Sequence, residues 1–136
     1  MRYLAIDYGA KRTGLAVCDA GERVVSPLGV LHGQKGLVEK IGQIVTDESI
    51  EAVVVGLPLN MDGSEGPQAK QVLAFAEQLR RHIAIPIRFQ DERLSSFEAE
   101  QKLREIGLSR AKKQERLDAL AAAEILQSFL EQQKGG

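Results

Sequence analysis

The chain has 136 residues, a length that fits one domain covering residues 1–136. It has 18 basic and 19 acidic residues and a formal net charge of −1, so composition alone does not indicate a nucleic-acid or membrane binder. Its single cysteine excludes an internal disulfide, and its two isolated histidines argue against a zinc site. Neither a signal peptide nor a membrane span is expected, and a reducing, cytoplasmic location fits the sequence.

The first half of the chain predicts strands followed by a helix. Strands are expected at residues 2–8, 13–18 and 23–31. The turn from Gly9 to Arg12 is so short that the first two strands should form an antiparallel hairpin, and Pro27 should break or bend the third. Apolar residues recur at helical spacing from Leu37 to Val45. The continuous apolar run from Ala52 to Leu57 is typical of a parallel strand buried on both faces.

The second half alternates helices and strands. The expected elements are a turn-rich loop at 59–66, a helix from Pro67, a strand from Ile83 to Phe89, a helix capped by Ser95 and Glu98 and ended by Gly107, and a last helix at about 114–132. This order predicts an α/β chain in which an antiparallel meander is extended by right-handed crossovers into a mixed sheet.

Three acidic residues stand out against this background. Asp7 lies near the end of the first strand, Glu92 lies at the end of a later one, and Asp118 begins an apolar stripe on the last helix. Together they indicate a site for a hard divalent ion, Mg²⁺ or Mn²⁺, because such ions prefer carboxylate oxygens. Asp118→Asn should abolish activity because Asn is a weaker ligand for such an ion, and it should not lower stability because it relieves the repulsion among the three acids.

Each acid also has a purely structural interpretation, and taken singly these interpretations are favoured over a metal site. Asp7 would accept backbone hydrogen bonds in the turn at Gly9. The other two acids would form ion pairs with nearby arginines, Glu92 with Arg93 and Asp118 with Arg110 or Arg116.

Basic residues lie beside the acids, as a phosphate-binding site requires. They occur in the turn after Asp7 and in the segment before Asp118, and they are Lys11, Arg12, Arg110, Lys112, Lys113 and Arg116. Cations at a helix N-terminus oppose the helix dipole, so the second segment is expected either to be a flexible loop or to bind an anion. A solvated basic loop explains the charge but not its location beside the acids.

Segments along nearly the whole chain resemble, in order, the YqgF family, also called RuvX, a branch of the RNase H-like nuclease superfamily. They are LAIDYG (4–9) with GLAV (14–17), VVGLPLNMDG (54–63), DERLSS (91–96) and LDA (117–119). The family's catalytic acids map onto Asp7, Glu92 and Asp118. The resemblance implies an RNase H-like fold, with a mixed five-stranded sheet flanked by helices.

The resemblance also implies a cytoplasmic nuclease that processes the 5′ end of pre-16S rRNA in ribosome biogenesis. Two alternatives stay open: a Holliday junction resolvase-like DNA endonuclease in recombination or repair, and a non-catalytic RNA-binding ribosome-assembly factor. In the nuclease, the three acids would hold two divalent ions about 4 Å apart. The nucleic-acid-binding residues would be Lys11, Arg12, Asn60, Arg93, Arg110, Lys112, Lys113 and Arg116, with Arg93 mainly orienting Glu92.

The expected partners are structured RNA, branched or single-stranded DNA and ribosomal precursor particles, with no membrane and with the chain a monomer or a homodimer. The strongest rival is an ATP-binding protein. Asp7, Gly9 and Gly14 also resemble the phosphate-binding hairpin of actin-like and sugar-kinase ATPases. Those folds need two lobes, and this chain is too short for a second one.

Overall fold

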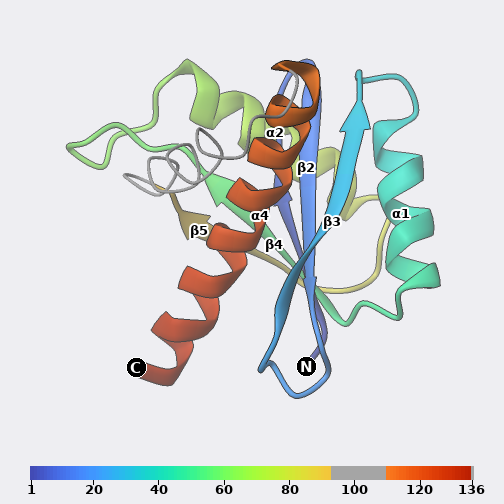
Figure 1. Ribbon diagram of the computed structural model, residues 1–136. Helices are drawn as coiled ribbons and strands as arrows, with labels where there is room; N and C mark the ends of the chain where they lie inside the picture. Colours follow the sequence, from blue (N-terminus) through green and yellow to red (C-terminus); the bar gives the residue numbers. More distant parts are fainter. Residues whose placement is uncertain (93–109, 136) are drawn as a thin grey trace.

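The computed structural model describes residues 1–92 and 110–135, and at its centre lies a five-stranded mixed sheet (Figure 1). The strand order is β3-β2-β1-β4-β5. The β1–β2 and β2–β3 pairs are antiparallel, and the β1–β4 and β4–β5 pairs are parallel. The strands are β1 (Tyr3–Asp7), β2 (Arg12–Cys18), β3 (Val25–His32), β4 (Ala52–Leu57) and β5 (Ile87–Asp91). The predicted meander with parallel extensions is therefore confirmed.

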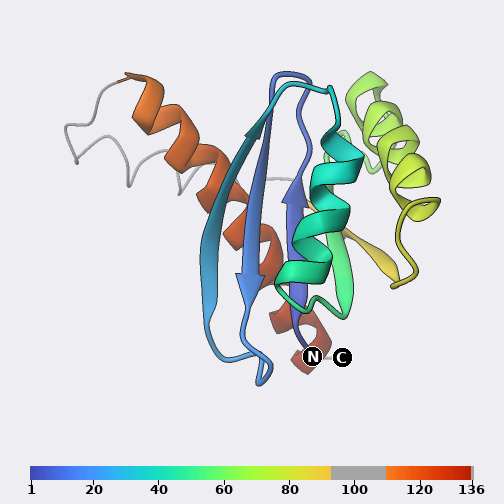
Figure 2. The ribbon, with the colours of Figure 1, turned by 90° about the vertical axis from the view of Figure 1, so that its right-hand side faces the viewer.

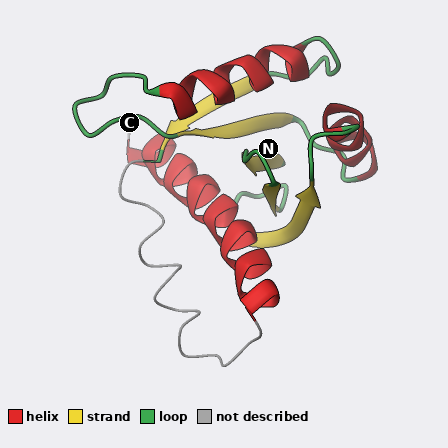
Figure 3. Ribbon diagram, turned by 90° about the horizontal axis from the view of Figure 1, so that it is seen from above, coloured by secondary structure: helices red, strands yellow, loops and turns green. Residues whose placement is uncertain are grey.

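The described helices cover both faces of this sheet. They are α1 (Leu37–Asp47), α2 (Pro67–Arg80) and α4 (Arg110–Gly135). Figures 2 and 3 show α1 and α2 on one face and α4 on the other. Because successive strand residues point to opposite faces, Leu4 and Ile6 of β1 pack in the core with α1 and α2, whereas Tyr3 and Ala5 pack against α4. No helix in the described ranges is both long and apolar enough to cross a bilayer.

The third strand carries the expected irregularity. The β2–β3 register shifts between Leu15 and Ala16, whose partners are Gly29 and Pro27, so one extra residue of β3 stands between them. A bulge tolerates proline because a residue there need not donate a hydrogen bond to the ladder. The irregularity expected at Pro27 is thus present as a register shift, and the strand is not broken there.

The strand predicted at Ile83–Phe89 is wrong in its bounds, since β5 begins at Ile87 and ends at Asp91. Ile83 and Ile85 do pack against the core, but as part of a loop. Pro86 has no amide hydrogen to donate, and its carbonyl accepts a bond from the Val53 amide (2.9 Å) just before the strand begins. The shift places Glu92 one residue beyond the end of β5.

The last helix also begins earlier than predicted, at Arg110 instead of about residue 114. The basic segment before Asp118 is therefore helical, and the flexible-loop interpretation is wrong. Alanine, lysine, arginine, glutamine and glutamate are all strong helix formers, and the unfavourable interaction of a cation with the helix dipole is only about 0.3–1 kcal/mol. The helix predicted from Ser95 to Gly107 lies outside the described residues.

Candidate active site

The carboxyl ends of β1, β4 and β5 lie at the same edge of the sheet, since these strands are parallel (Figure 1). Asp7 is the last residue of β1, and Glu92 follows β5, where its amide donates to the Leu57 carbonyl (3.2 Å). Asp7 alternates with Ala5 and Tyr3, which pack against α4, so its side chain is on the α4 face. Two acids far apart in the sequence thus meet at one edge.

A glycine in β2 brings the third acid to this edge. Gly14 pairs with Asp7 in the β1–β2 ladder. A Cβ atom on Gly14 would lie well within 3.0 Å of the carbonyl oxygen of Asp118, closer than real Cβ atoms approach other atoms. The missing side chain therefore lets the backbone of α4 rest directly on β2, and this contact places Asp118 beside Asp7.

A second glycine makes room for Glu92. A Cβ atom on Gly56, in β4, would lie 2.5 Å from the Glu92 Oε2 atom and would also overlap the side chain of Ile125 from α4. The Glu92 carboxylate therefore lies over the backbone of β4, on the face that carries Asp7. Sequence reasoning singled out Gly14 only as part of motifs and did not expect either glycine to make room for an acid, although a glycine inside a buried apolar strand often marks such a close approach.

The three carboxylates influence one another electrostatically. Burial, and then the negative charge of Asp118, raises the pKa of Asp7 from 3.8 to about 6. Burial, followed by the charges of Asp7 and Asp91, raises the pKa of Glu92 from 4.5 to about 8. Since Asp7 interacts with both other acids, it is the centre of the cluster. Within the described residues, no hydrogen bond or ion pair reaches its carboxylate, so the structural interpretation of Asp7 is not supported.

Asp118 has a different partner from the one predicted. Arg12, the first residue of β2, donates from Nε to Asp118 Oδ2 (2.7 Å), and Gln114 donates to Oδ1 (3.3 Å). The ion pair is therefore made with another element and not with Arg116 of the same helix, while the side chain of Arg110 lies outside the described residues. Arg12 was expected to contact phosphate, yet in this structure its guanidinium is directed at a candidate catalytic acid.

The donor set is chemically suited to a hard divalent cation, because it consists of carboxylates that repel one another. Its geometry is not that of a complete coordination shell. Within residues 1–92 and 110–135, no three acidic, histidine or cysteine side chains lie close enough to hold one ion together. One oxygen of Asp118 is instead occupied by Arg12.

The turn between β1 and β2 is held by a residue that sequence reasoning missed. Gln34, in the loop before α1, donates to the carbonyls of Gly9 (2.9 Å) and Ala10 (3.0 Å) and accepts from the Tyr8 hydroxyl (2.8 Å). The Tyr8 ring stacks on Phe75 of α2 with centroids 4.3 Å apart. This network fixes the turn that carries Lys11, whose side chain is exposed.

The other expected nucleic-acid-binding residues are distributed around the acids. Asn60 donates to the Ser64 hydroxyl (2.9 Å), so its amide shapes the loop after β4. Lys112, Lys113 and Arg116 lie on the two turns of α4 before Asp118, within roughly 9 Å of it along the helix axis. Arg93 lies outside the described residues.

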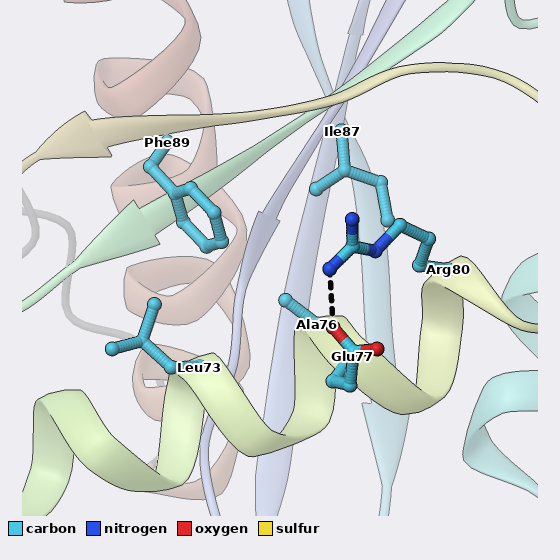
Figure 4. Close-up of a pocket in the computed structure, with 6 residues that line it drawn as sticks. All are labelled: Leu73, Ala76, Glu77, Arg80, Ile87 and Phe89. Carbon is cyan, nitrogen blue, oxygen red and sulfur yellow. Dashed lines mark hydrogen bonds and ion pairs between the residues drawn. The ribbon is translucent and has the colours of Figure 1, made fainter.

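A groove of about 290 Å³ lies on the opposite face of the sheet, between α2 and β5 (Figure 4). Its walls are apolar except for an ion pair between Arg80 and Glu77, and Phe89 is 42% exposed beside it. The lining residues are Leu73, Ala76, Glu77, Arg80, Ile87 and Phe89. Since the acids face α4, this groove is not part of the candidate active site.

The family model described as "RuvX: Holliday junction resolvase" matches residues 1–132. The chain belongs to the RuvX family. A relative from Anaeromyxobacter sp. (strain Fw109-5), named "Putative pre-16S rRNA nuclease", is 46% identical over 96% of this chain and 97% of its own length. A relative of the same name from Caldanaerobacter subterraneus is 44% identical, over 98% of this chain and 99% of its own. The resemblance seen in the sequence is thus confirmed.

Solved structures with little sequence identity share the fold of this RuvX chain. T. thermophilus RuvC in complex with a Holliday junction substrate has a TM-score of 0.59 at 16% identity, over 96% of both chains. The fowlpox virus Holliday junction resolvase has a TM-score of 0.56 at 12% identity, over 97% of this chain and 99% of its own. These similarities confirm the RNase H-like fold expected from the sequence.

Without metal, the stability of this RuvX protein should fall as the pH rises from about 5 to 8. The folded-state pKa values of Asp7 and Glu92 are raised to about 6 and about 8, so in this range the folded state binds more protons than the unfolded state. The free energy of unfolding then decreases with pH, by on the order of a few kcal/mol. Glu92→Gln should remove the part of the decrease between pH 6 and 8.

Thermal unfolding in chelator across this pH range, with the variant beside the wild type, tests the expectation. Glu65→Gln, which removes an exposed carboxylate from the loop after β4, controls for the change in net charge. The difference in stability between wild type and Glu92→Gln should grow from pH 6 to 8. If it does not, Glu92 does not have a raised pKa in the folded protein.

Proposed function

We propose that this chain is a metal-dependent hydrolase of RNA phosphodiester bonds, and that it processes the 5′ end of pre-16S rRNA in the cytoplasm. The observation that carries the proposal is the coupled cluster of Asp7, Glu92 and Asp118 at one edge of an RNase H-like sheet. The name shared by the relatives supports the choice of RNA. The whole chain, residues 1–136, is taken as the nuclease domain.

In this proposal Asp7, Glu92 and Asp118 hold Mg²⁺ or Mn²⁺, two ions in the complete site. When bound, such ions would lower the pKa of an attacking water and would stabilise the negative charge on the leaving oxygen. Glu92, with a pKa of about 8, carries a proton at neutral pH and must release it to become a ligand. Asp7 is the last residue of the central strand β1, where it pairs with Gly14 of β2, so its backbone is held in the sheet.

Binding of the substrate would use the basic side chains on either side of the acids. Lys11 extends from the turn held by Gln34, and Lys112, Lys113 and Arg116 extend from the first turns of α4. Contacts from these residues to flanking phosphates give affinity without sequence choice, because the phosphate backbone is the same at every position. Recognition of a particular RNA then depends on its shape.

A branched DNA is the second candidate substrate. The family model is described as a Holliday junction resolvase, and the fold resembles that of a resolvase bound to such a junction. The same acids would cleave either nucleic acid, because the two-metal reaction acts on the phosphate and not on the sugar or base. The choice between RNA and DNA is therefore an experimental question about binding.

The experiment offers the purified chain an RNA spanning the 5′ precursor segment of 16S rRNA, a four-way DNA junction and a linear DNA duplex. Each is incubated with Mg²⁺, with Mn²⁺ or with excess chelator. Cleavage of the RNA that requires metal is the expected result. Metal-dependent cleavage of the junction alone would favour the second candidate, and binding without cleavage of any substrate would contradict a nuclease and favour an assembly factor. Asp7→Asn protein, purified in parallel, detects contaminating nucleases.

A further inference from the structure

We propose that Arg12 is a positioning residue that competes with the divalent cation for Asp118: its guanidinium holds the carboxylate until the cation binds and is then released toward the substrate. The proposal rests on the metal-dependent nuclease function above and assigns to one residue a role that links metal binding to substrate binding.

The carboxylate of Asp118 is held by two neighbouring side chains. Its side chain is 19% exposed, and both carboxylate oxygens accept hydrogen bonds, Oδ2 from Arg12 and Oδ1 from Gln114. The Arg12 bond is 2.7 Å long and joins opposite charges, which makes it the stronger of the two. The backbone of Asp118 lies directly against Gly14, and this contact sets the distance between Asp118 and β2. The orientation of this carboxylate is thus set by Arg12.

In this orientation, the guanidinium of Arg12 opposes the binding of a cation at Asp118. Gly14 is the partner of Asp7 in the β1–β2 ladder, and the backbone of Asp118 lies directly against Gly14, so Asp118 is a near neighbour of Asp7. A divalent ion shared by them would lie close to the guanidinium, and two positive charges in one small site repel each other. Arg12 therefore neutralises Asp118 in the metal-free protein and weakens the binding of the ion.

The side chain of Arg12 is able to move away from Asp118 while the backbone of Arg12 stays in place. Arg12 is paired with His32 in the β2–β3 ladder, and the turn before it is held by Gln34. The Arg12 side chain is nonetheless 35% exposed, so its guanidinium borders solvent. A guanidinium released there would reach solvent, and its planar donors match a phosphate group.

The test measures Mn²⁺ binding by calorimetry in the absence of any nucleic acid. Arg12→Gln should bind Mn²⁺ roughly five- to tenfold more tightly than the wild type, because a positive charge is removed beside the ion. Lys11→Gln removes a charge from the same turn without breaking an ion pair seen in the described residues, and should change the affinity less than about twofold. Arg12→Lys, which keeps the charge but loses the Nε donor, should show an intermediate gain and serves if Arg12→Gln does not fold.

A second readout separates competition from a purely structural ion pair. Despite its tighter Mn²⁺ binding, Arg12→Gln should cleave RNA with a KM raised about tenfold or more, since a phosphate contact is lost. A structural pair predicts instead that Mn²⁺ affinity is unchanged or weaker in both Arg12 variants, and that result would overturn the proposal. If the Arg12 variants bind Mn²⁺ more tightly but the wild type cleaves neither RNA nor DNA, the nuclease function fails and the competition stands.

Discussion

Asp7→Asn is expected to abolish phosphodiester cleavage and, in metal-free buffer above pH 7, to raise the melting temperature. Asn has nearly the shape of Asp but is a poor ligand for a hard cation. We expect the rate to fall at least about a thousandfold, which corresponds to about 4 kcal/mol of lost transition-state stabilisation. Asp7 is the suitable position because it interacts with both Asp118 and Glu92.

The gain in stability follows from the same environment. The pKa of Asp7 is raised from 3.8 to about 6, so the folded protein must accommodate an unfavourable charge at any pH above about 6. That unfavourable term is absent below pH 4, where the carboxyl is protonated in both states, and is fully present at pH 8. Asn should therefore raise the stability at pH 8 by on the order of 1–3 kcal/mol and leave it unchanged at pH 4.

Thermal melts at both pH values, with chelator and with Mg²⁺, test this expectation alongside the cleavage assay. The wild type should gain stability from Mg²⁺ and Asp7→Asn should not. Asp19→Asn is the matched control, since Asp19 lies in the turn at the far end of β2 and accepts bonds from the amides of Arg23 and Val24. Near-normal cleavage by Asp7→Asn would remove this residue from the proposed metal site.

The electrostatics change one expectation drawn from the sequence alone. If none of the three acids had a basic partner, replacing any one of them with its amide would stabilise the protein. This reasoning gave the prediction that Asp118→Asn is not destabilising. Asp118, however, has Arg12 at 2.7 Å, and its replacement leaves a guanidinium without its partner. The expected gain in stability therefore belongs to Asp7, and for Asp118→Asn a modest loss is now expected.

The parts of the fold that depend on local pattern were predictable. Strand alternation places Asp7 on the face of Ala5 and Tyr3, and the apolar stripe that begins at Asp118 predicts that the last helix packs on the sheet; the structure shows that it packs on that same face. The antiparallel meander and its extension into a mixed sheet were predictable from the short connections and from the continuous apolar run of β4. The start of β5 was missed because isoleucines that pack in a loop give the same apolar signal as a strand.

The contacts that complete the site were not predictable, because they join residues with no periodic relation. Arg12 and Asp118 are 106 residues apart, and nothing in either segment distinguishes an ion pair from two separate surface charges. Gln34 reaches the turn at Gly9 from 25 residues away, and glutamine carries no positional signature. The roles of Gly14 and Gly56 are visible only once the atoms that fill the space of the missing side chains are known.

Gly14→Ala should move α4 away from β2, with large effects on both stability and activity. The added methyl group would meet the carbonyl oxygen of Asp118, a backbone atom that has no rotamer to change. Overpacking of this kind typically destabilises by about 1–3 kcal/mol, and we expect the upper end of that range here. Displacement of Asp118 by about 1 Å should lower the cleavage rate about a hundredfold at temperatures where the variant is still folded.

Two glycine variants make this prediction specific to the contact. Gly42→Ala, in α1, meets no atom within 4 Å and should stabilise the protein by about 0.5–1 kcal/mol, as alanine does inside a helix. Gly56→Ala meets the ends of two side chains, Ile125 and Glu92, which are able to shift, so it should lower activity more than stability. Denaturant unfolding and cleavage rates of the three variants supply the comparison. If Gly14→Ala is as stable and as active as the wild type, α4 does not rest on β2 at this residue. Asp118 would then not be held beside Asp7 by this contact.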